Sequence, residues 1–169
     1  MEFTLRPWRE SDLKSLVKYA NNKNIAKFLT NKFPHPYTKK DGIAFIEFAS
    51  KTDPIHIFAI DVDGEAVGGI GIHPQTDIYE KNAELGYWIA ESFWGKGIAS
   101  KAINMMVDFA FVTFDINRIY AMTFENNNIS QNVLIKNKFV LEAHFSKTVF
   151  KNNEYLDELV YGFRRENWK

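Results

Sequence analysis

The sequence has no cysteine among its 169 residues. This absence excludes disulfide bonds, thiolate ligands for a metal, and a cysteine acting as nucleophile or covalent carrier. Any group transfer by this chain must therefore proceed without a cysteinyl intermediate. Histidine is also scarce, and the spacing of the four residues is not typical of metal ligands, so we predict no metal; they are His35, His56, His73 and His144.

The chain also has no net charge, because 21 Lys and Arg residues balance 21 Asp and Glu residues. Such a balance gives no basic field of the kind that non-specific nucleic-acid binding needs. The N-terminus lacks a basic segment followed by an apolar one, and no apolar run is long enough to span a membrane. We therefore predict a cytoplasmic protein with no nucleic-acid and no membrane partner.

Apolar and aromatic side chains are abundant. Hydrophobic residues make up 46% of the chain and aromatic residues 15%, with fifteen Phe, seven Tyr and four Trp. A chain of this length can bury a sizeable core and still carry a cleft. Because no linker or change of composition divides it, we predict a single domain over 1–169 with an aromatic-rich core.

Local patterns predict the secondary structure. Thr38 and Asp41 have the spacing of a helix N-terminal box, and Asp63-Gly64 and Asn152-Asn153 are typical hairpin turns. We predict helices at 11–20, 25–29, 39–50, 98–113 and 130–137, and strands at 3–7, 55–62, 67–72, 82–90, 115–123, 139–150 and 155–164. Alternating strands and helices in the second half predict parallel pairing beside an antiparallel first half. The fold class is thus α+β, with a mixed sheet and helices on both faces.

The most informative stretch is 84–100, where a strand pattern runs into a glycine-bearing turn and then a helix. Gly95 and Gly97 leave the backbone free of Cβ atoms at the start of that helix. Consecutive N–H groups can therefore approach an anion closely, and a diphosphate would fit there. The structural alternative is that the glycines only turn the chain.

Two common nucleotide motifs do not match this turn. The dinucleotide fingerprint needs a third glycine, which is missing. The Walker pattern needs Lys-Ser or Lys-Thr after the last glycine, but Gly97 is followed by Ile98 and Ala99. No G-x-S-x-G sequence is present, so a serine hydrolase is not predicted either.

With these classes set aside, the turn resembles the pyrophosphate motif Gln/Arg-x-x-Gly-x-Gly/Ala of the GNAT superfamily of acetyl-CoA-dependent N-acetyltransferases. Residues 94–99 match it, with Trp94 in place of the usual Gln or Arg. This Trp-Gly-Lys-Gly, following Glu-Leu-Gly-Tyr-Trp, resembles the branch that contains the ribosomal-protein N-terminal-alanine acetyltransferases. Segments 34–45, 127–136 and 157–168 are similar to the same branch. The resemblance implies a GNAT fold with a mostly antiparallel sheet of about seven strands.

The resemblance implies a site for acetyl-CoA. Backbone amides from Lys96 to Ser100 would hold the pyrophosphate, aided by the helix dipole. Trp88 and Ile89 would run beside the pantetheine, and Asn127 would bond to the pantetheine arm or to an ordered water. The predicted cofactor-binding residues are Trp88, Ile89, Trp94, Gly95, Lys96, Gly97, Ile98, Ala99, Ser100 and Asn127. Lys101 and Lys136 are further candidates, with solvated surface lysines as the alternative.

The end of the 130–137 helix departs from the family pattern. The branch usually has Lys-x-Gly-Phe there, where this chain has Lys-Asn-Lys-Phe at 136–139. Asparagine adopts the left-handed conformation more readily than other residues with a side chain. We therefore predict that Asn137 takes the left-handed cap position.

Direct acetyl transfer requires a neutral amine, so a group must accept a proton from the ammonium. By resemblance Glu84 is the first candidate for this base, and a strand-end charge exposed to solvent is the alternative. Asp157 is the second candidate, and His35 and His73 are further ones. By its match to the family's Asn-x-x-Ser block, Ser130 is the candidate hydroxyl that would stabilise the leaving thiolate, unless it only caps the following helix.

The acceptor amine is the open question. The branch resemblance favours the N-terminal α-amine of a protein, contacted by His35, Tyr37 and Glu84. Small-molecule acceptors such as polyamines, antibiotics and metabolites remain alternatives, although lysines at 32 and at 39–40 disfavour a polycation. The competing class is a non-catalytic acyl-CoA-binding module. Either a monomer or a homodimer is compatible with the sequence.

Overall fold

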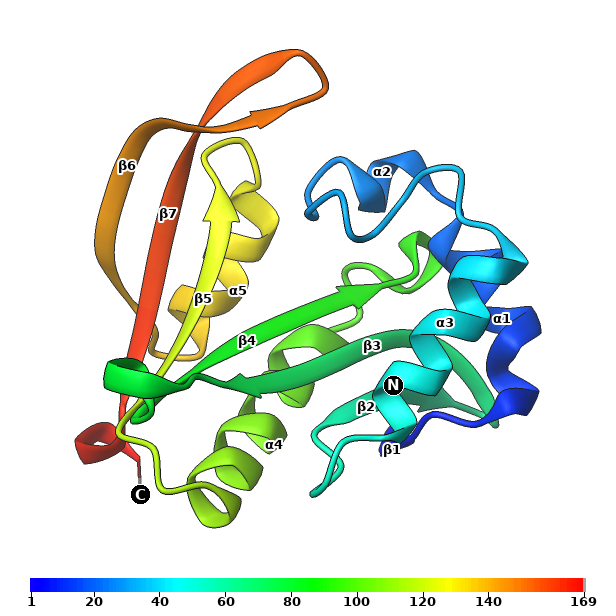
Figure 1. Ribbon diagram of the computed structural model, residues 1–169, viewed down its shortest axis with the longest axis horizontal. Coiled ribbons are helices and arrows are strands. Elements are labelled where there is room, and N and C mark those ends of the chain that lie inside the picture. The colour runs from blue at the N-terminus through cyan, green and yellow to red at the C-terminus, as the bar shows by residue number, and fades with distance from the viewer. Residues whose placement is uncertain (169) are drawn as a thin grey trace. The chain divides into compact units, whose positions relative to one another are not determined.

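The structure is a computed structural model that describes residues 1–168 (Figure 1). Its strands are β1 (Thr4–Pro7), β2 (Ile57–Val62), β3 (Glu65–Pro74), β4 (Asn82–Ile89), β5 (Arg118–Phe124), β6 (Val140–Lys151) and β7 (Glu154–Arg164). Its α-helices are α1 (Leu13–Ala20), α2 (Lys23–Ala26), α3 (Lys39–Ser50), α4 (Ile98–Thr113) and α5 (Asn128–Lys136). Among the short 3-10 turns, η3 (Glu91–Phe93) follows β4 directly.

The strands form a seven-stranded sheet in the order β1-β2-β3-β4-β5-β7-β6. Neighbours β1–β2, β2–β3, β5–β7 and β6–β7 are antiparallel. Strands β4 and β5 are parallel, with Glu84 opposite Tyr120, and α4 supplies the long crossover that parallel strands require. The predicted mixed, mostly antiparallel sheet is confirmed.

The chain divides into two compact units. The first comprises Met1–Gly71 with Tyr87–Ala102, and the second comprises Ile72–Gly86 with the described chain from Ile103 onward. Strands β3 and β4 and helix α4 each pass from one unit into the other. The prediction of one domain is not tested by this division.

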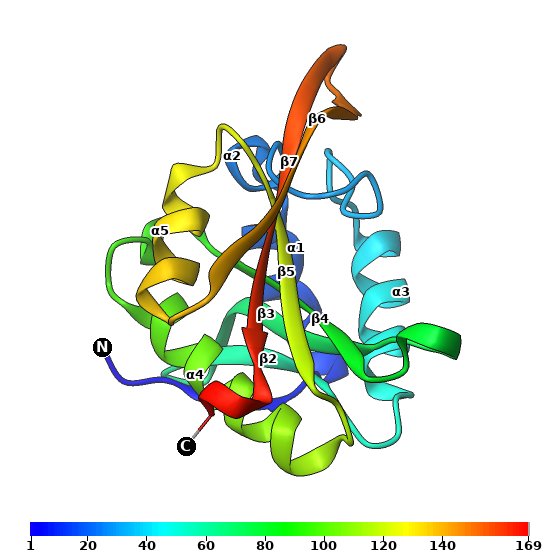
Figure 2. The ribbon, with the colours of Figure 1, turned by 90° about the vertical axis from the view of Figure 1, so that its left-hand side faces the viewer.

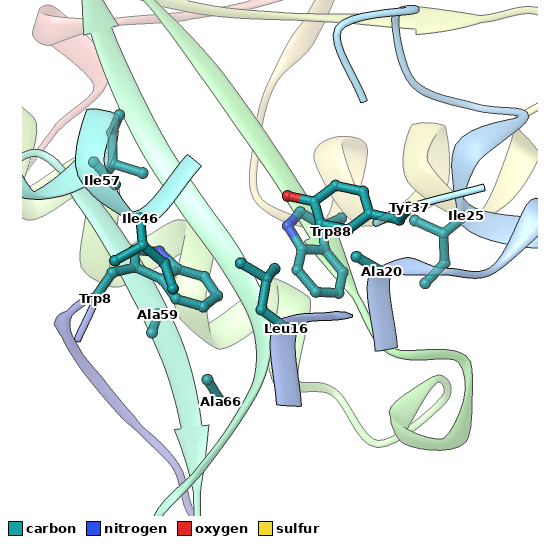
Figure 3. Close-up of a cluster of buried hydrophobic side chains, with 11 residues drawn as sticks. Trp8, Leu16, Ala20, Ile25, Tyr37, Ile46, Ile57, Ala59, Ala66 and Trp88 are labelled. Atoms are coloured by element: carbon teal, nitrogen blue, oxygen red, sulfur yellow. The ribbon is translucent and has the colours of Figure 1, made fainter. Parts of the chain in front are cut away.

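The first unit has an aromatic core. Side chains of α1 and α3 pack with those of β2, β3 and β4, and Leu16 lies between a group around Trp8 and a group around Trp88 and Tyr37 (Figure 3). The rings of Trp8 and Phe45 meet edge to face with centroids 5.2 Å apart. Such burial of large rings is the dominant stabilising contribution in a domain of this size.

Local signals in this unit fix the start of α3 and the β2–β3 turn as the sequence predicts, but not the bounds of α2. Thr38 and Asp41 form the capping box of α3, with the backbone N–H of each donating to the side chain of the other. Asp63 and Gly64, with φ of +52° and +86°, make the turn between β2 and β3. The short helix predicted at 25–29 instead spans Lys23–Ala26, because Asn22 caps it by accepting from the N–H of Asn24.

The second unit is built around β5, β7 and β6, with α5 along one side of these strands (Figure 2). The hairpin of β6 and β7 turns at Asn152 and Asn153, both left-handed, as the sequence predicts, and extends beyond the end of β5. Strand β5 begins at Arg118 and not at residue 115. The N–H groups of Asn117 and Arg118 both donate to the carbonyl of Lys81, which sets the first pairing with β4.

Two predictions about α5 are wrong. The helix starts at Asn128, and its N-cap is Asn127, whose Oδ1 accepts from the N–H of Ser130 at 3.2 Å. Ser130 therefore lies in the first turn and is not the cap. At the other end Asn137 has φ −90° and ψ +21°, and the left-handed residue is Lys138, with φ +64°.

Candidate active site

The glycine turn of the first unit has the predicted geometry. Gly95 and Gly97 have φ of +74° and +76°, the region that L-residues rarely adopt, and α4 begins at the next residue, Ile98. A Cβ added at either glycine would meet no atom within 4 Å. The glycines therefore serve backbone conformation, and the space beside them is open to a ligand at the helix N-terminus.

Two hydrogen bonds from Trp94 brace this turn. Its indole Nε1 donates to the carbonyl of Ile89 at 2.7 Å, and its N–H donates to the carbonyl of Glu91. The ring is still 37% exposed. Lys96 is exposed, with its ammonium 4.7 Å from the centroid of the Phe93 ring. The tryptophan that departs from the family motif thus ties the turn to the end of β4.

Trp88 is a core residue and not a surface along which a ligand could lie. Its side chain is 9% exposed and meets Phe33 edge to face, with centroids 5.6 Å apart. Ile89 is also buried, and its carbonyl is bonded to Trp94. Any contact of Trp88 with a cofactor would therefore come from its main chain.

The two residues predicted to contact the acceptor in segment 34–45 differ in burial. Tyr37 is 5% exposed, and its N–H donates to Oδ1 of Asn21. Burial, followed by the charge of Asp41, raises the pKa of the Tyr37 phenol to about 12, so the group stays neutral. His35 is exposed. The structure therefore gives Tyr37 a packing role, which its position directly after Pro36 did not indicate.

In the second unit Glu84 lies half-buried on β4, on the sheet face opposite the buried Ala83 and Leu85. Tyr120 is its partner on β5 and shares this face. Burial and then the charge of Glu84 raise the pKa of Tyr120, which keeps its hydroxyl protonated. The sequence analysis missed Tyr120, because only the parallel register places it beside Glu84.

His73 belongs to the same group of side chains. Its Nε2 is 3.9 Å from the position that a Cβ on Gly86 would occupy, and Gly86 points to the same face as Glu84. The second unit therefore brings two of the predicted bases, Glu84 and His73, to one sheet face together with Tyr120.

Asp157, the second candidate base, forms hydrogen bonds within the β6–β7 hairpin. Its Oδ2 lies 2.6 Å from Nε2 of His144, and its Oδ1 accepts from the N–H of Lys147. The contact with His144, followed by that with Lys147, lowers the pKa of Asp157. A carboxyl group with a lowered pKa is a weak proton acceptor, so the structure disfavours Asp157 as the base.

Asn127 and Ser130 are half-buried at the start of α5, where the Oδ1 of Asn127 serves the helix cap. The predicted site residues thus fall into two sets. The first unit holds the turn 94–100 with His35, Tyr37, Trp88 and Ile89, and the second holds Glu84, Asn127, Ser130 and Asp157. Lys101 and Lys136 are both exposed. Within residues 1–168 no cluster of three or more metal-ligating side chains is found, and no helix is long and apolar enough to cross a membrane.

Comparison with known proteins places the chain in a family. Residues 2–140 match the family model of the acetyltransferase (GNAT) domain. The Bacillus subtilis protein YdaF is 30% identical over 107 residues, which cover 63% of this chain and 58% of that protein. The ribosomal-protein-serine acetyltransferase of Escherichia coli is 30% identical over 105 residues, 62% of this chain and 58% of its own. The chain thus spans little more than half the length of these two relatives.

The spermidine N(1)-acetyltransferase of Escherichia coli is 25% identical over 158 residues, which cover 89% of this chain and 80% of that protein. The ribosomal-protein-S5-alanine acetyltransferase from Vibrio fischeri has the same fold, with a TM-score of 0.78, 22% identity and coverage of 100% and 96%. So does the acetyltransferase MccE in complex with acetyl-CoA and AMP, with a TM-score of 0.82, 23% identity and coverage of 96% and 92%. The chain belongs to the GNAT family of acetyltransferases.

Proposed function

We propose that this protein transfers the acetyl group of acetyl-CoA to the N-terminal α-amine of a protein, directly and within a ternary complex. The glycine turn is the observation that carries this proposal. Two left-handed glycines with open space beside them stand at the N-terminus of a 16-residue helix, where backbone amides and the helix dipole favour an anion. This fits the pyrophosphate of CoA.

The residues present have distinct tasks in this proposal. Acetyl-CoA supplies the activated acetyl group. The amides from Lys96 to Ser100 bind its pyrophosphate, Trp94 holds the turn in shape, and the main chain at Trp88 and Ile89 borders the pantetheine. In the second unit Glu84 accepts a proton from the ammonium group of the acceptor. The neutral amine then attacks the thioester carbonyl, the C–S bond breaks, and the CoA thiolate takes up the proton that the amine nitrogen loses. A hydrogen bond from the Ser130 hydroxyl stabilises the leaving sulfur.

The choice of acceptor rests on similarity. The segments that resemble the ribosomal-protein branch, and the relative named for acetylation of a ribosomal protein at serine, support an N-terminal α-amine. The relative named for spermidine covers more of the chain and makes a polyamine the second candidate. Lysines at 32 and 39–40 flank the segment predicted to face the acceptor and disfavour a polycation.

A thiol-release screen tests the proposed function. Purified protein is mixed with acetyl-CoA and a panel of N-terminal peptides, spermidine and amino sugars, and mass spectrometry identifies the product. We expect thiol release with α-acetylated peptide. If only spermidine is acetylated, the acceptor is a polyamine and not a protein N-terminal α-amine. CoA binding without thiol release from any amine would indicate a binding module, and no binding of CoA would overturn the proposal.

Gly97→Ala tests whether the glycine turn binds the CoA pyrophosphate. A left-handed alanine costs about 1–2 kcal/mol. We expect the free turn of Gly97→Ala to relax out of this conformation and to regain it only on binding, so CoA affinity should fall about tenfold in calorimetry. Gly64→Ala is the matched control, since Gly64 is also left-handed with open space around it but lies in the β2–β3 turn. Unchanged CoA affinity in Gly97→Ala would contradict the assignment.

A further inference from the structure

The asparagines between α1 and α2 contact the residue that opens the cofactor turn. Asn22 Nδ2 donates to one carboxylate oxygen of Glu91 at 2.6 Å. Asn24 Nδ2 lies 3.1 and 3.2 Å from the two oxygens of the same carboxylate. Two side-chain amides separated by one residue thus hold Glu91 across about 70 residues of sequence. We call Asn22, Asn24 and Glu91 the asparagine clasp.

Asn22 performs two tasks, accepting one hydrogen bond and donating another. Its Oδ1 accepts from the N–H of Asn24 and so caps α2, while its Nδ2 donates to Glu91. Aspartate and serine are equally good helix caps. An ionised aspartate at this position would still cap α2 but could not donate a hydrogen bond to Glu91. The cap alone therefore does not require asparagine.

Glu91 is the first residue of η3, and the Trp94 N–H donates to its carbonyl. Phe93 meets Tyr19 of α1 edge to face, with centroids 6.0 Å apart. The hydrogen bonds from Asn22 and then Asn24 lower the pKa of Glu91, so the carboxylate stays ionised and accepts from both amides at neutral pH. Contacts from α1 and from the segment that leads into α2 therefore hold the first residues of the turn, whereas α4 continues from its last residue.

We propose that the asparagine clasp is a positioning device that fixes the conformation of turn 91–97 and thereby sets the affinity for the CoA pyrophosphate. This inference rests on the proposed function for the identity of the ligand. None of the three side chains needs to touch CoA. The clasp acts by keeping the turn ordered before the ligand arrives, so that binding does not have to order it.

An exchange of donor and acceptor across the clasp tests this. Asn22→Asp keeps the helix cap but places a second carboxylate against Glu91. In Asn22→Asp/Glu91→Gln the new amide can donate to the new carboxylate, and the net charge equals that of the wild type. Asn21→Asp is the matched control: it adds the same charge one residue away, and its side-chain oxygen still accepts from the N–H of Tyr37.

Calorimetry with CoA gives the first readout. We expect Asn22→Asp to bind CoA about fivefold more weakly than the wild type, a factor in keeping with an exposed charged contact. The double variant and Asn21→Asp should both lie within about twofold of the wild type. Equal weakening in Asn21→Asp and Asn22→Asp would show that added charge alone acts. No recovery in the double variant would show that a restored donor–acceptor pair does not hold the turn. Either result would overturn the clasp.

Hydrogen exchange without ligand gives the second readout. Amides in 93–97 should exchange faster in Asn22→Asp, and at the wild-type rate in Asn21→Asp and in the double variant. This result does not depend on CoA. If the wild type fails to bind CoA while the exchange pattern holds, the proposed function fails and the positioning role stands. If amide exchange in 93–97 is unchanged in Asn22→Asp and the wild type binds CoA, the positioning role of the clasp is rejected and the proposed function is not.

Discussion

Glu84→Gln is expected to lower kcat/KM for the amine about 100-fold near pH 6.5, in the range that loss of a general base produces. The loss should shrink as the pH rises through the pKa of an N-terminal amine, about 8. Below that pKa most acceptor molecules carry the proton that Glu84 would remove, whereas above it the amine is already neutral. CoA affinity should not change. Rates measured between pH 6 and pH 9.5 with the peptide found in the screen check this.

Glu80→Gln is the matched control for this experiment. It makes the same substitution four residues earlier in an exposed loop and should leave the pH profile unaltered. An unaltered profile in Glu84→Gln would remove Glu84 from the role of base. If Asp157→Asn instead lowered the rate at low pH, Asp157 would be the base, although its pKa is lowered.

Tyr120 offers a check that needs no substrate. The charge of Glu84 contributes to the raised pKa of Tyr120. Removing that charge in Glu84→Gln should therefore lower the pKa of Tyr120 towards its ordinary value, because an anion no longer opposes formation of the phenolate. If the pKa of Tyr120 stays where it is, the two side chains do not interact and the arrangement around Glu84 needs revision.

Short-range signals in the sequence predict much of this fold. The capping box of α3 and the two hairpin turns depend on residues close together in the chain, and all three form as expected. The glycine turn is of the same kind, since the left-handed backbone at Gly95 and Gly97 is a local requirement. Such features are readable because the interacting atoms are near neighbours in sequence.

The end of α5 shows where local reasoning fails. Phe139 N–H donates to the carbonyl of Leu134 and Lys138 N–H to that of Ile135, the pattern of a Schellman cap, with Leu134 and Phe139 both buried. The side chain of Asn137 bonds to the carbonyl of Val133 and so continues the helical path. The left-handed conformation therefore falls on Lys138, the position that aligns with the family's glycine.

Contacts between segments distant in sequence are the features of the fold and the site that the sequence does not predict. Tyr37 follows a proline and precedes polar residues, yet it is buried in the core cluster of the first unit that also contains Leu16 and Trp88. Tyr120 reaches Glu84 only through the parallel register of β4 and β5. The asparagines after α1 predict no more than a helix end, whereas the fold sets two of them against Glu91. Each depends on a pairing across tens of residues, which periodicity does not encode.

Gly68→Ala is expected to destabilise the protein by about 3 kcal/mol, the upper part of the range for overpacking. Gly68 lies on β3, where a Cβ would stand 2.5 Å from the carbonyl oxygen of Trp88 and 3.1 Å from Cα of Ile89. Both obstacles are backbone atoms, so no side chain can move aside. The Tm in a thermal melt should fall by about 10 °C for a domain of this size.

Gly64→Ala separates crowding from loss of backbone freedom. That glycine has φ +86° and no atom within 4 Å of an added Cβ, so alanine there brings strain alone, about 1 kcal/mol. Gly68→Ala should therefore lower the Tm about three times as much. Equal effects of the two substitutions would mean that β3 and the end of β4 separate at little cost. That outcome would also weaken the case for Trp94 as a brace, because its acceptor, the carbonyl of Ile89, belongs to the same strand end. A large Gly68→Ala effect indicates instead that the glycine turn starts from a strand end held rigidly by close backbone contact.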